Sequence, residues 1–181
     1  MRIISGTFKG RRITAPKKLP VRPTTDMAKE GLFNILNNQF YFDEISVLDL
    51  FSGTGNISYE FASRGTSQIT SVDADYGCVQ FIEKTSEDFK MGLNIQKNDV
   101  FSYLEKTSLK SDVIFADPPY NMNLEDFEKI HQLVFGNELL LAEGQLIIEH
   151  AKQMKLSHLS NFLSERKYGG SVFSFFKKSR S

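Results

Sequence analysis

The chain has 181 residues, of which 40% are hydrophobic and 24% charged, so we expect one globular domain or one domain with a small extension. Its single cysteine, Cys78, excludes an internal disulfide and a cysteine-based zinc cluster. No apolar run approaches the length of about 18 residues that a membrane span needs, and the N-terminus lacks a signal-peptide core. We therefore expect a cytoplasmic protein that makes no membrane contact.

The formal net charge of zero conceals an uneven distribution of charge along the chain. Residues 1–25 contain seven Lys or Arg and no acid, and residues 150–181 contain seven against one Glu, so the excess acid lies between them. Basic ends are typical of proteins that contact a polyanion, although short solvated ends are often basic as well. The N-terminal cations that could contact such a polyanion include Arg2, Lys9, Arg11, Arg12 and Arg22.

The first 25 residues are predicted to form a small basic extension. Two β-prone stretches, residues 2–5 and 12–14, flank two glycines, which predicts a short β-hairpin. Three prolines then predict an extended connector, and either Thr24 or Thr25 can cap the helix that follows.

Residues 26–181 are predicted to form an α/β domain with a doubly wound, mostly parallel sheet. Apolar strand-like stretches alternate with amphipathic helical ones, which is typical of a sheet with helices on both faces. The last strand is apolar on both sides and should lie between two others. After the helix that begins at Asp26, the expected helices are residues 57–64, 77–89, 100–106 and 124–135. The expected strands are residues 46–51, 68–73, 93–96, 112–116, 145–149 and 171–177.

Several chemically informative residues fall at or just after the ends of these expected strands. In open α/β sheets, ligands bind at the carboxyl ends of the strands, so these residues predict one shared site. They are Asp49, Gly53, Gly55, Asp73, Asp99 and Asp117.

Residues 49–55, Asp-Leu-Phe-Ser-Gly-Thr-Gly, form a glycine loop between a strand and a helix. The glycines allow a ligand to approach the backbone closely. Ser58 stands where a dinucleotide fingerprint has its third glycine, and Asp49 would repel a pyrophosphate while attracting a sulfonium or ammonium group. The loop therefore favours S-adenosylmethionine over a nicotinamide or flavin dinucleotide, the alternative being an ordinary tight turn.

Two further strand ends supply candidate cofactor contacts. Asp73 can accept hydrogen bonds from both hydroxyls of a ribose. Asn98 and Asp99 can accept from an adenine amino group, and Val100 can cover the ring. Asp99 could equally be the N-cap of the helix over 100–106, and the two roles are compatible.

Residues 117–120, Asp-Pro-Pro-Tyr, are the most specific motif. The prolines remove backbone donors and leave carbonyls that only accept, Asp117 adds a carboxylate, and Tyr120 offers a ring for stacking on a base. Such a pocket fits an exocyclic amine, because acceptors on its N–H bonds return the nitrogen lone pair for attack on a methyl sulfonium. We assign catalysis to Asp117, Pro118, Pro119 and Tyr120; a base within a helix would first have to be extruded.

The motifs resemble a known family over essentially the whole chain. The glycine loop with Asp-Pro-Pro-Tyr is similar to the S-adenosylmethionine-dependent amino-methyltransferases. Residues 2–6 (Arg-Ile-Ile-Ser-Gly), 9–11 (Lys-Gly-Arg) and 22–26 (Arg-Pro-Thr-Thr-Asp) more narrowly resemble the bacterial 16S rRNA guanine-N2 methyltransferases. Ser5 departs from that pattern, in which glycine is more common, and could alter the hairpin turn.

The resemblance implies a seven-stranded Rossmann-like methyltransferase sheet and transfer of a methyl group to the N2 amine of a guanine in 16S rRNA, in the small subunit or an assembly intermediate. It implies S-adenosylmethionine as cofactor, S-adenosylhomocysteine as product, no metal, and a monomer. Residues 1–25 would be the RNA-contacting extension and 26–181 the methyltransferase domain. The implied cofactor-binding residues are Thr25, Asp49, Phe51, Gly53, Gly55, Asp73, Ala74, Asn98, Asp99 and Val100.

Some alternatives stay open at this point. The same pocket would serve a DNA adenine-N6 or cytosine-N4 methyltransferase, although the chain has no room for a large DNA-reading domain. A glutamine-amide methyltransferase and a non-catalytic RNA-binding assembly factor are two others. Arg22, Thr24 and Thr25 could contact either cofactor or RNA, and His150 could approach the target base.

Overall fold

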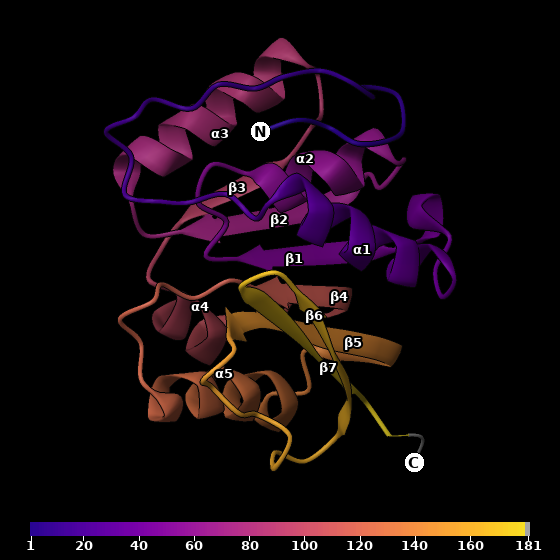
Figure 1. Cartoon of the computed structure of the whole chain (residues 1–181), viewed down its shortest axis with the longest axis vertical. Coiled ribbons are helices and arrows are strands. Elements are labelled where there is room, and N and C mark those ends of the chain that lie inside the picture. The colour runs from indigo at the N-terminus through magenta and orange to yellow at the C-terminus, as the bar shows by residue number, and fades with distance from the viewer. Residues whose placement is uncertain (180–181) are drawn as a thin grey trace.

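One sheet of seven strands organises residues 1–179, the part of the chain that the computed structural model describes (Figure 1). The strands are β1 (Ser46–Leu50), β2 (Gln68–Asp73), β3 (Asn94–Lys97), β4 (Ser111–Ala116), β5 (Leu140–Ala151), β6 (Phe162–Tyr168) and β7 (Ser171–Lys177). Their spatial order is β3-β2-β1-β4-β5-β7-β6; the first five are parallel, and β7 runs antiparallel to both β5 and β6. The predicted doubly wound sheet and the interior position of the last strand are confirmed.

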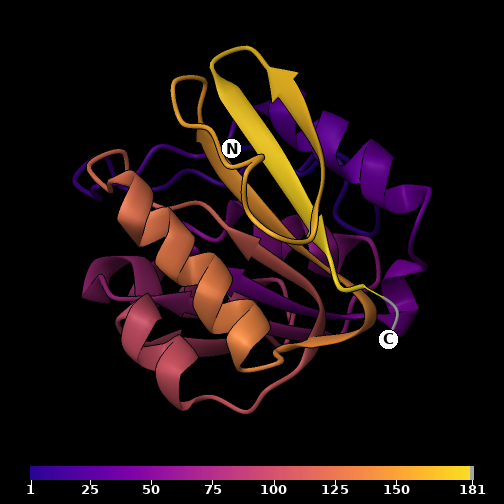
Figure 2. The ribbon, with the colours of Figure 1, turned by 90° about the horizontal axis from the view of Figure 1, so that it is seen from below.

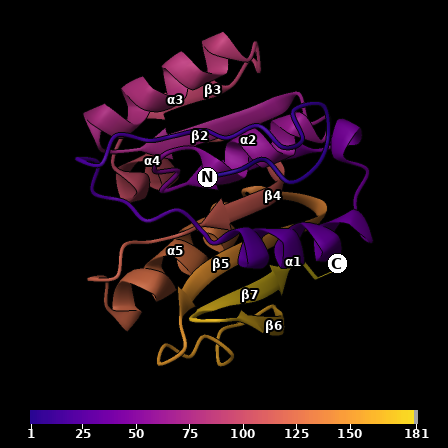
Figure 3. The same cartoon turned by 45° about the horizontal axis from the view of Figure 1, so that its top comes forward.

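Helices cover both faces of this sheet, because alternate strand residues are apolar on each side. The helices are α1 (Asp26–Asn37), α2 (Asn56–Ser63), α3 (Tyr76–Asp88), α4 (Val100–Lys106) and α5 (Leu124–Gly136), with a 3₁₀ turn, η1 (Phe42–Glu44). Leu48 and Ile114 pack with α4 and α5 on one face, which is turned toward the viewer in Figure 2. Val47 and Phe115 pack with α1 and α2 on the other face, and Figure 3 shows α1 on that side. No helix among residues 1–179 is long and apolar enough to cross a membrane.

Two strands differ from the sequence-based expectation. The strand expected over 145–149 is longer and spans Leu140–Ala151, with an irregular register near its start, where Glu143 has a left-handed φ of 64°. β6 was not among the strands assigned from pattern. It is a polar edge strand with charged residues at 165–167 and a register shift against β7, so it lacks the regular alternation that identifies a half-buried strand.

The predicted N-terminal hairpin is present only in reduced form. A single bridge, Arg2 to Arg12, forms in place of two strands. The backbone N–H groups of Ile4 and Ser5 donate instead to the carboxylate of Glu60 on α2, at 2.8 and 3.1 Å. Because these donors serve Glu60, they are not available for a regular strand ladder.

A buried ion pair holds this extension to the main domain. The Lys29 side chain on α1 is 1% exposed; its Nζ lies 3.1 Å from Glu60 Oε1 and donates to the Arg2 carbonyl at 2.6 Å. Burial lowers the pKa of Lys29, against the opposing effect of Glu60. Ile3 and Ile13 are also buried in a small apolar cluster with α2 and α3. The extension therefore packs tightly against the helices, and the division at residue 25 stays a prediction.

Candidate active site

Acidic side chains from neighbouring parallel strands gather at the carboxyl ends of those strands. Asp49 lies in β1, Asp73 ends β2 and Asp117 directly follows β4, as expected from the sequence. Glu149, near the end of β5, joins them and was not predicted as a site residue. The register between β4 and β5 pairs Ala116 with Ile148. Asp117 and Glu149 directly follow these two residues and therefore lie side by side.

The glycine loop between β1 and α2 is tightly bent. Phe51, Gly53 and Gly55 all have left-handed φ angles, of 55°, 56° and 87°. A side chain at Gly55 would collide with the Tyr59 ring, since a Cβ there would lie 2.5 Å from its Cζ. Gly55 is also the N-cap of α2. The fold itself thus requires glycine at position 55, while the close approach of a cofactor to the loop stays a prediction.

Asp73 shapes this loop from the neighbouring strand. Its Oδ2 accepts from the Gly53 backbone N–H at 2.8 Å, and its Oδ1 accepts from Asp75 N–H at 2.8 Å. Each carboxylate oxygen has a second lone pair, so Asp73 can still accept from a ribose diol. Burial raises the pKa of Asp73 in spite of these hydrogen bonds.

Asp49 is buried beneath the loop, at 1% exposure. Its Oδ2 accepts from the Ser58 hydroxyl at 2.6 Å, and Ser58 Oγ lies 2.7 Å from Ser71 Oγ. Burial, assisted by the charge of Asp73, raises the pKa of Asp49 to about 7 although Ser58 opposes the shift. Asp49 has no cationic partner among residues 1–179, and a buried carboxylate of that kind is costly, which makes Asp49 a candidate for contact with a ligand.

Most of the remaining predicted cofactor residues lie at the same edge. Asp99 is the N-cap of α4, where its Oδ2 accepts from Ser102 N–H at 2.9 Å, so its predicted alternative role is confirmed. Asn98 donates its backbone N–H to the Asp73 carbonyl, Val100 is buried, and Ala74 is exposed. Thr25 caps α1 by accepting from Ala28 N–H at 3.2 Å. Their contacts with a cofactor remain predictions.

The Asp-Pro-Pro-Tyr segment borders a cavity of about 50 Å³ between β4, β5 and α5. Asp117, Pro118 and Glu149 line it, and the Tyr120 ring at its rim is 83% exposed. Burial and the nearby charges of Glu149 and Asp49 raise the pKa of Asp117 well above its usual range. Among residues 1–179, no ion pair involves Asp117 or Glu149. The cavity thus offers acidic acceptors that have no cationic partner among these residues.

Thr24 connects the N-terminal connector to this cavity. Its hydroxyl is buried and donates to Glu149 Oε2 at 2.7 Å. Its carbonyl accepts from Asn56 Nδ2 at 3.0 Å. The sequence contained a signal for Glu149, because this acid ends the apolar strand expected over 145–149, just as Asp73 ends β2.

His150 is held by its neighbours in β5 and β7. Nδ1 lies 2.9 Å from the Ala151 carbonyl, which can only accept, so Nδ1 carries the hydrogen. Nε2 lies 2.7 Å from Ser174 Oγ, and burial lowers the pKa of His150, which favours the neutral ring. The ring lines the cavity, but both of its nitrogens already have partners.

The five predicted RNA-contacting residues are all exposed. Arg2 pairs with Asp26 at 3.3 Å, and the Arg11 guanidinium lies over the Phe89 ring, 5.9 Å from its centroid. Figure 1 shows the N-terminal segment running beside α3. These positions leave a basic N-terminal surface open to solvent.

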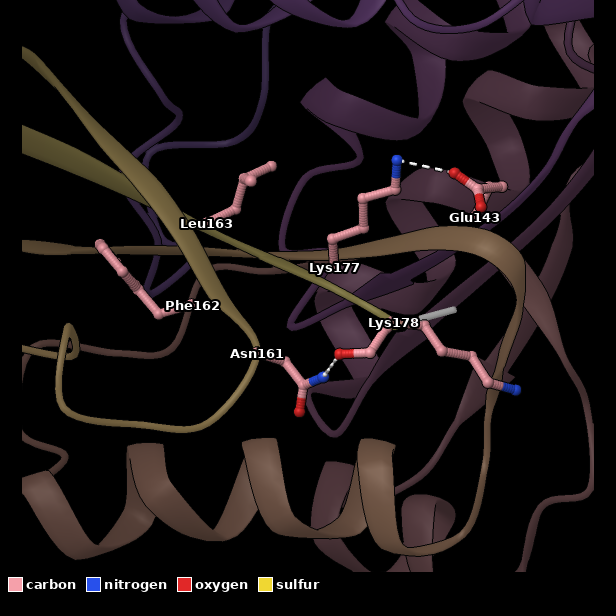
Figure 4. Close-up of a pocket in the computed structure, with 7 residues that line it drawn as sticks. Glu143, Asn161, Phe162, Leu163, Lys177 and Lys178 are labelled. Atoms are coloured by element: carbon pink, nitrogen blue, oxygen red, sulfur yellow. Dashed lines mark hydrogen bonds and ion pairs between the residues drawn. The ribbon is translucent and has the colours of Figure 1, made fainter. Parts of the chain in front are cut away.

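A second cavity, of about 400 Å³, lies at the amino-terminal end of β5 and is drawn in Figure 4. Lys177 and Glu143 form an ion pair there, with 2.7 Å between Nζ and Oε2. None of the predicted site residues lines it. Within the described range, no group of three or more His, Cys, Asp or Glu is arranged to hold a metal ion.

The sheet order, the glycine loop after β1 and the Asp-Pro-Pro-Tyr segment after β4 are those of a methyltransferase with a Rossmann-like sheet. A solved structure from Escherichia coli, provisionally named as the methyltransferase YhhF, has a TM-score of 0.85 to this chain. The two are 26% identical, and the match covers 98% of this chain and 97% of that one.

The chain belongs to the family described as Conserved hypothetical protein 95, whose model matches residues 1–177. A Bacillus subtilis protein with the provisional name rRNA methyltransferase YlbH is 31% identical over 186 residues, covering 98% of this chain and 99% of that protein. Ribosomal RNA small subunit methyltransferase D of Escherichia coli K12 is 29% identical over 150 residues, covering 82% and 74%. The family resemblance and the methyltransferase class are confirmed.

Proposed function

We propose that the protein transfers a methyl group from S-adenosylmethionine to the exocyclic N2 amine of a guanine in small-subunit rRNA, within the subunit or an assembly intermediate. The observation that carries this proposal is the acceptor-lined cavity at Asp117 and Pro118, where Asp117 is near enough to the buried Asp49 for the charge of Asp49 to raise its pKa. The rRNA substrate is supported by the small-subunit methyltransferase relative from Escherichia coli.

The residues at the carboxyl ends of β1 and β2 fit S-adenosylmethionine. Gly53 and Gly55 present no side chain, Asp73 retains lone pairs for a ribose diol, and Asp49 supplies a buried negative charge toward a cationic group. When bound, the cofactor supplies a methyl group that its sulfonium already activates. The carboxylates of this chain then hold the cofactor and favour its positive charge in a poorly solvated site.

The Asp-Pro-Pro-Tyr segment would prepare the amine. Asp117 and the Pro118 carbonyl accept its N–H bonds, which draws the nitrogen lone pair out of the ring system. Tyr120, exposed at the rim, stacks on the base once the base has left its helix. The positively charged nitrogen that forms on methylation gives up a proton, and Asp117 is the adjacent acceptor, which its raised pKa makes a stronger base.

Product identification tests this proposal. The protein is incubated with isotopically labelled S-adenosylmethionine and, separately, with small subunits from cells lacking the modification, naked 16S rRNA, or duplex DNA. After nuclease digestion, mass spectrometry should find label in N2-methylguanine from an rRNA-containing substrate. Label in N6-methyladenine, in N4-methylcytosine or in protein would contradict the assignment, and an inactive protein would leave the assembly-factor alternative.

Reversing the charges of Arg11 and Arg12 tests the basic surface. The double change to glutamate should weaken RNA binding and make the slope of log affinity against log salt shallower by roughly one to two, because about two phosphate contacts are lost. Binding of free cofactor should be unaffected. The matched control reverses Lys106 and Lys110, two exposed lysines on and after α4, across the sheet. Equal salt slopes for both double variants would refute the N-terminal surface as the RNA contact.

A further inference from the structure

Glu149 faces the target cavity from the strand beside Asp117. The two acids follow the paired residues Ala116 and Ile148, and neighbouring strands stand about 4.8 Å apart. Both line the same cavity, and the charge of Glu149 acts on Asp117. A base whose amine lies at Asp117 therefore places a neighbouring atom of the same edge close to Glu149.

Neighbouring hydroxyl groups fix the Glu149 carboxylate. The residue is only 7% exposed, Thr24 Oγ1 donates to Oε2 at 2.7 Å, and the nearby Ser171 side chain favours the ionised form of the carboxyl. A neutral glutamine could accept the Thr24 hydrogen bond as well, and burial raises the pKa of Glu149, so anchoring Thr24 does not explain an acid at this position. Two buried acids side by side, with no cationic partner among residues 1–179, have acceptor oxygens that either a shared proton or the donors of a ligand can satisfy.

The Watson–Crick edge of guanine carries such donors. Its N2 amine and its ring N1–H are adjacent, and both donate. In adenine and cytosine the ring nitrogen next to the amine is an acceptor, which a carboxylate would repel. The cavity of about 50 Å³ has room for only a few atoms, so the edge of a base would enter it while the ring stays at the rim near Tyr120.

We propose that Glu149 accepts the N1–H of the target base while Asp117 accepts from the N2 amine, so that Glu149 is the residue that selects guanine. This inference rests on the proposed function, because it assumes that an amine enters at Asp117. Thr24 is then a positioning residue that orients Glu149. Thr24 belongs to the Arg-Pro-Thr-Thr-Asp motif of residues 22–26, so this role would place one residue of that motif at the base-binding cavity.

The test compares two target bases in otherwise identical substrates. RNA, free or reconstituted into subunits, carries at the methylated position either guanine or 2-aminopurine, which keeps the N2 amine but has an unprotonated N1. The wild-type protein should prefer guanine. Glu149→Gln can rotate its amide to donate to N1, so its preference for guanine, as a ratio of kcat/KM values, should fall by about 10- to 100-fold.

Glu125→Gln, the same substitution at an exposed position at the start of α5, is the matched control and should leave the ratio unchanged. Thr24→Val keeps the carboxylate but removes its hydroxyl donor, and should lower the ratio less; it replaces Glu149→Gln if that variant does not fold. If wild type and variant show equal ratios while both methylate guanine, the selection role is wrong and the proposed function stands. If wild type does not methylate guanine in RNA, the proposed function itself fails.

Discussion

Replacing Asp117 by alanine is expected to lower the rate of methyl transfer by a factor on the order of 10² or more while cofactor affinity stays nearly unchanged. The carboxyl follows β4 and takes part in no side-chain hydrogen bond found among residues 1–179, so its loss should disturb little of the fold. Burial and nearby acids raise its pKa, which means that the charged form is unfavourable in the folded protein. The alanine variant should therefore be at least as stable as wild type in thermal unfolding.

Asp117→Asn separates the acceptor from the charge. The asparagine keeps one acceptor oxygen for the amine but cannot take up a proton, so its rate should lie between wild type and alanine. Single-turnover rates report the chemical step, and calorimetric titration with S-adenosylhomocysteine reports the cofactor site. A fully active alanine variant would refute the acceptor role; loss of cofactor binding in the alanine variant would instead assign Asp117 to the cofactor.

The sequence was most informative where a local signal marks the chemistry. Asp73 and Asp117 end apolar runs, and the glycine loop lies between a strand-like and a helix-like stretch, so their place at one sheet edge follows from alternation alone. The caps Thr25 and Asp99 also depend on neighbours three residues away. Each of these features depends on residues that are close together in the sequence, so local patterns are enough to predict it.

Features that depend on distant partners were missed. Thr24 and Glu149 are 125 residues apart, and nothing near Thr24 predicts that bond. Lys29 has the pattern of a solvated helix residue, yet Glu60 makes it part of the core. His150 was a candidate because histidine is chemically versatile, but both of its ring nitrogens already have partners. Glu149 beside it lines the acceptor cavity and has no cationic partner among residues 1–179. Tertiary contacts decided each case, and spacing in the sequence does not carry them.

The buried carboxylate of Asp49 should make stability fall as pH rises. Its pKa is about 7 in the folded protein and near 3.9 in an unfolded chain. Between these values the folded state holds a proton that the unfolded state has released, so the free energy of unfolding decreases through this window and levels off above it. At pH 8 the cost amounts to roughly 4 kcal/mol for a shift of about three pKa units. Asp49→Asn, which cannot ionise, should remove most of it.

Denaturant unfolding of both proteins from pH 5 to pH 8 measures this difference. Asp73 and Asp117 also have raised pKa values and act in the same direction, so the contrast between wild type and variant isolates Asp49. Asp88→Asn, a change at an exposed position at the end of α3, is the charge-matched control. Parallel pH profiles for wild type and Asp49→Asn would show that Asp49 is not the group responsible.

The same substitution should weaken the binding of S-adenosylmethionine. A cation beside Asp49 favours the ionised carboxylate, so wild-type affinity should increase from pH 6 to pH 8 and the affinity of Asp49→Asn should not. A more stable variant with poorer binding is expected when a site retains a costly charge for its ligand. If the variant gained stability yet bound the cofactor as tightly as wild type at pH 8, the buried charge would serve neither the fold nor the cofactor, and the sulfonium-facing role of Asp49 would be excluded.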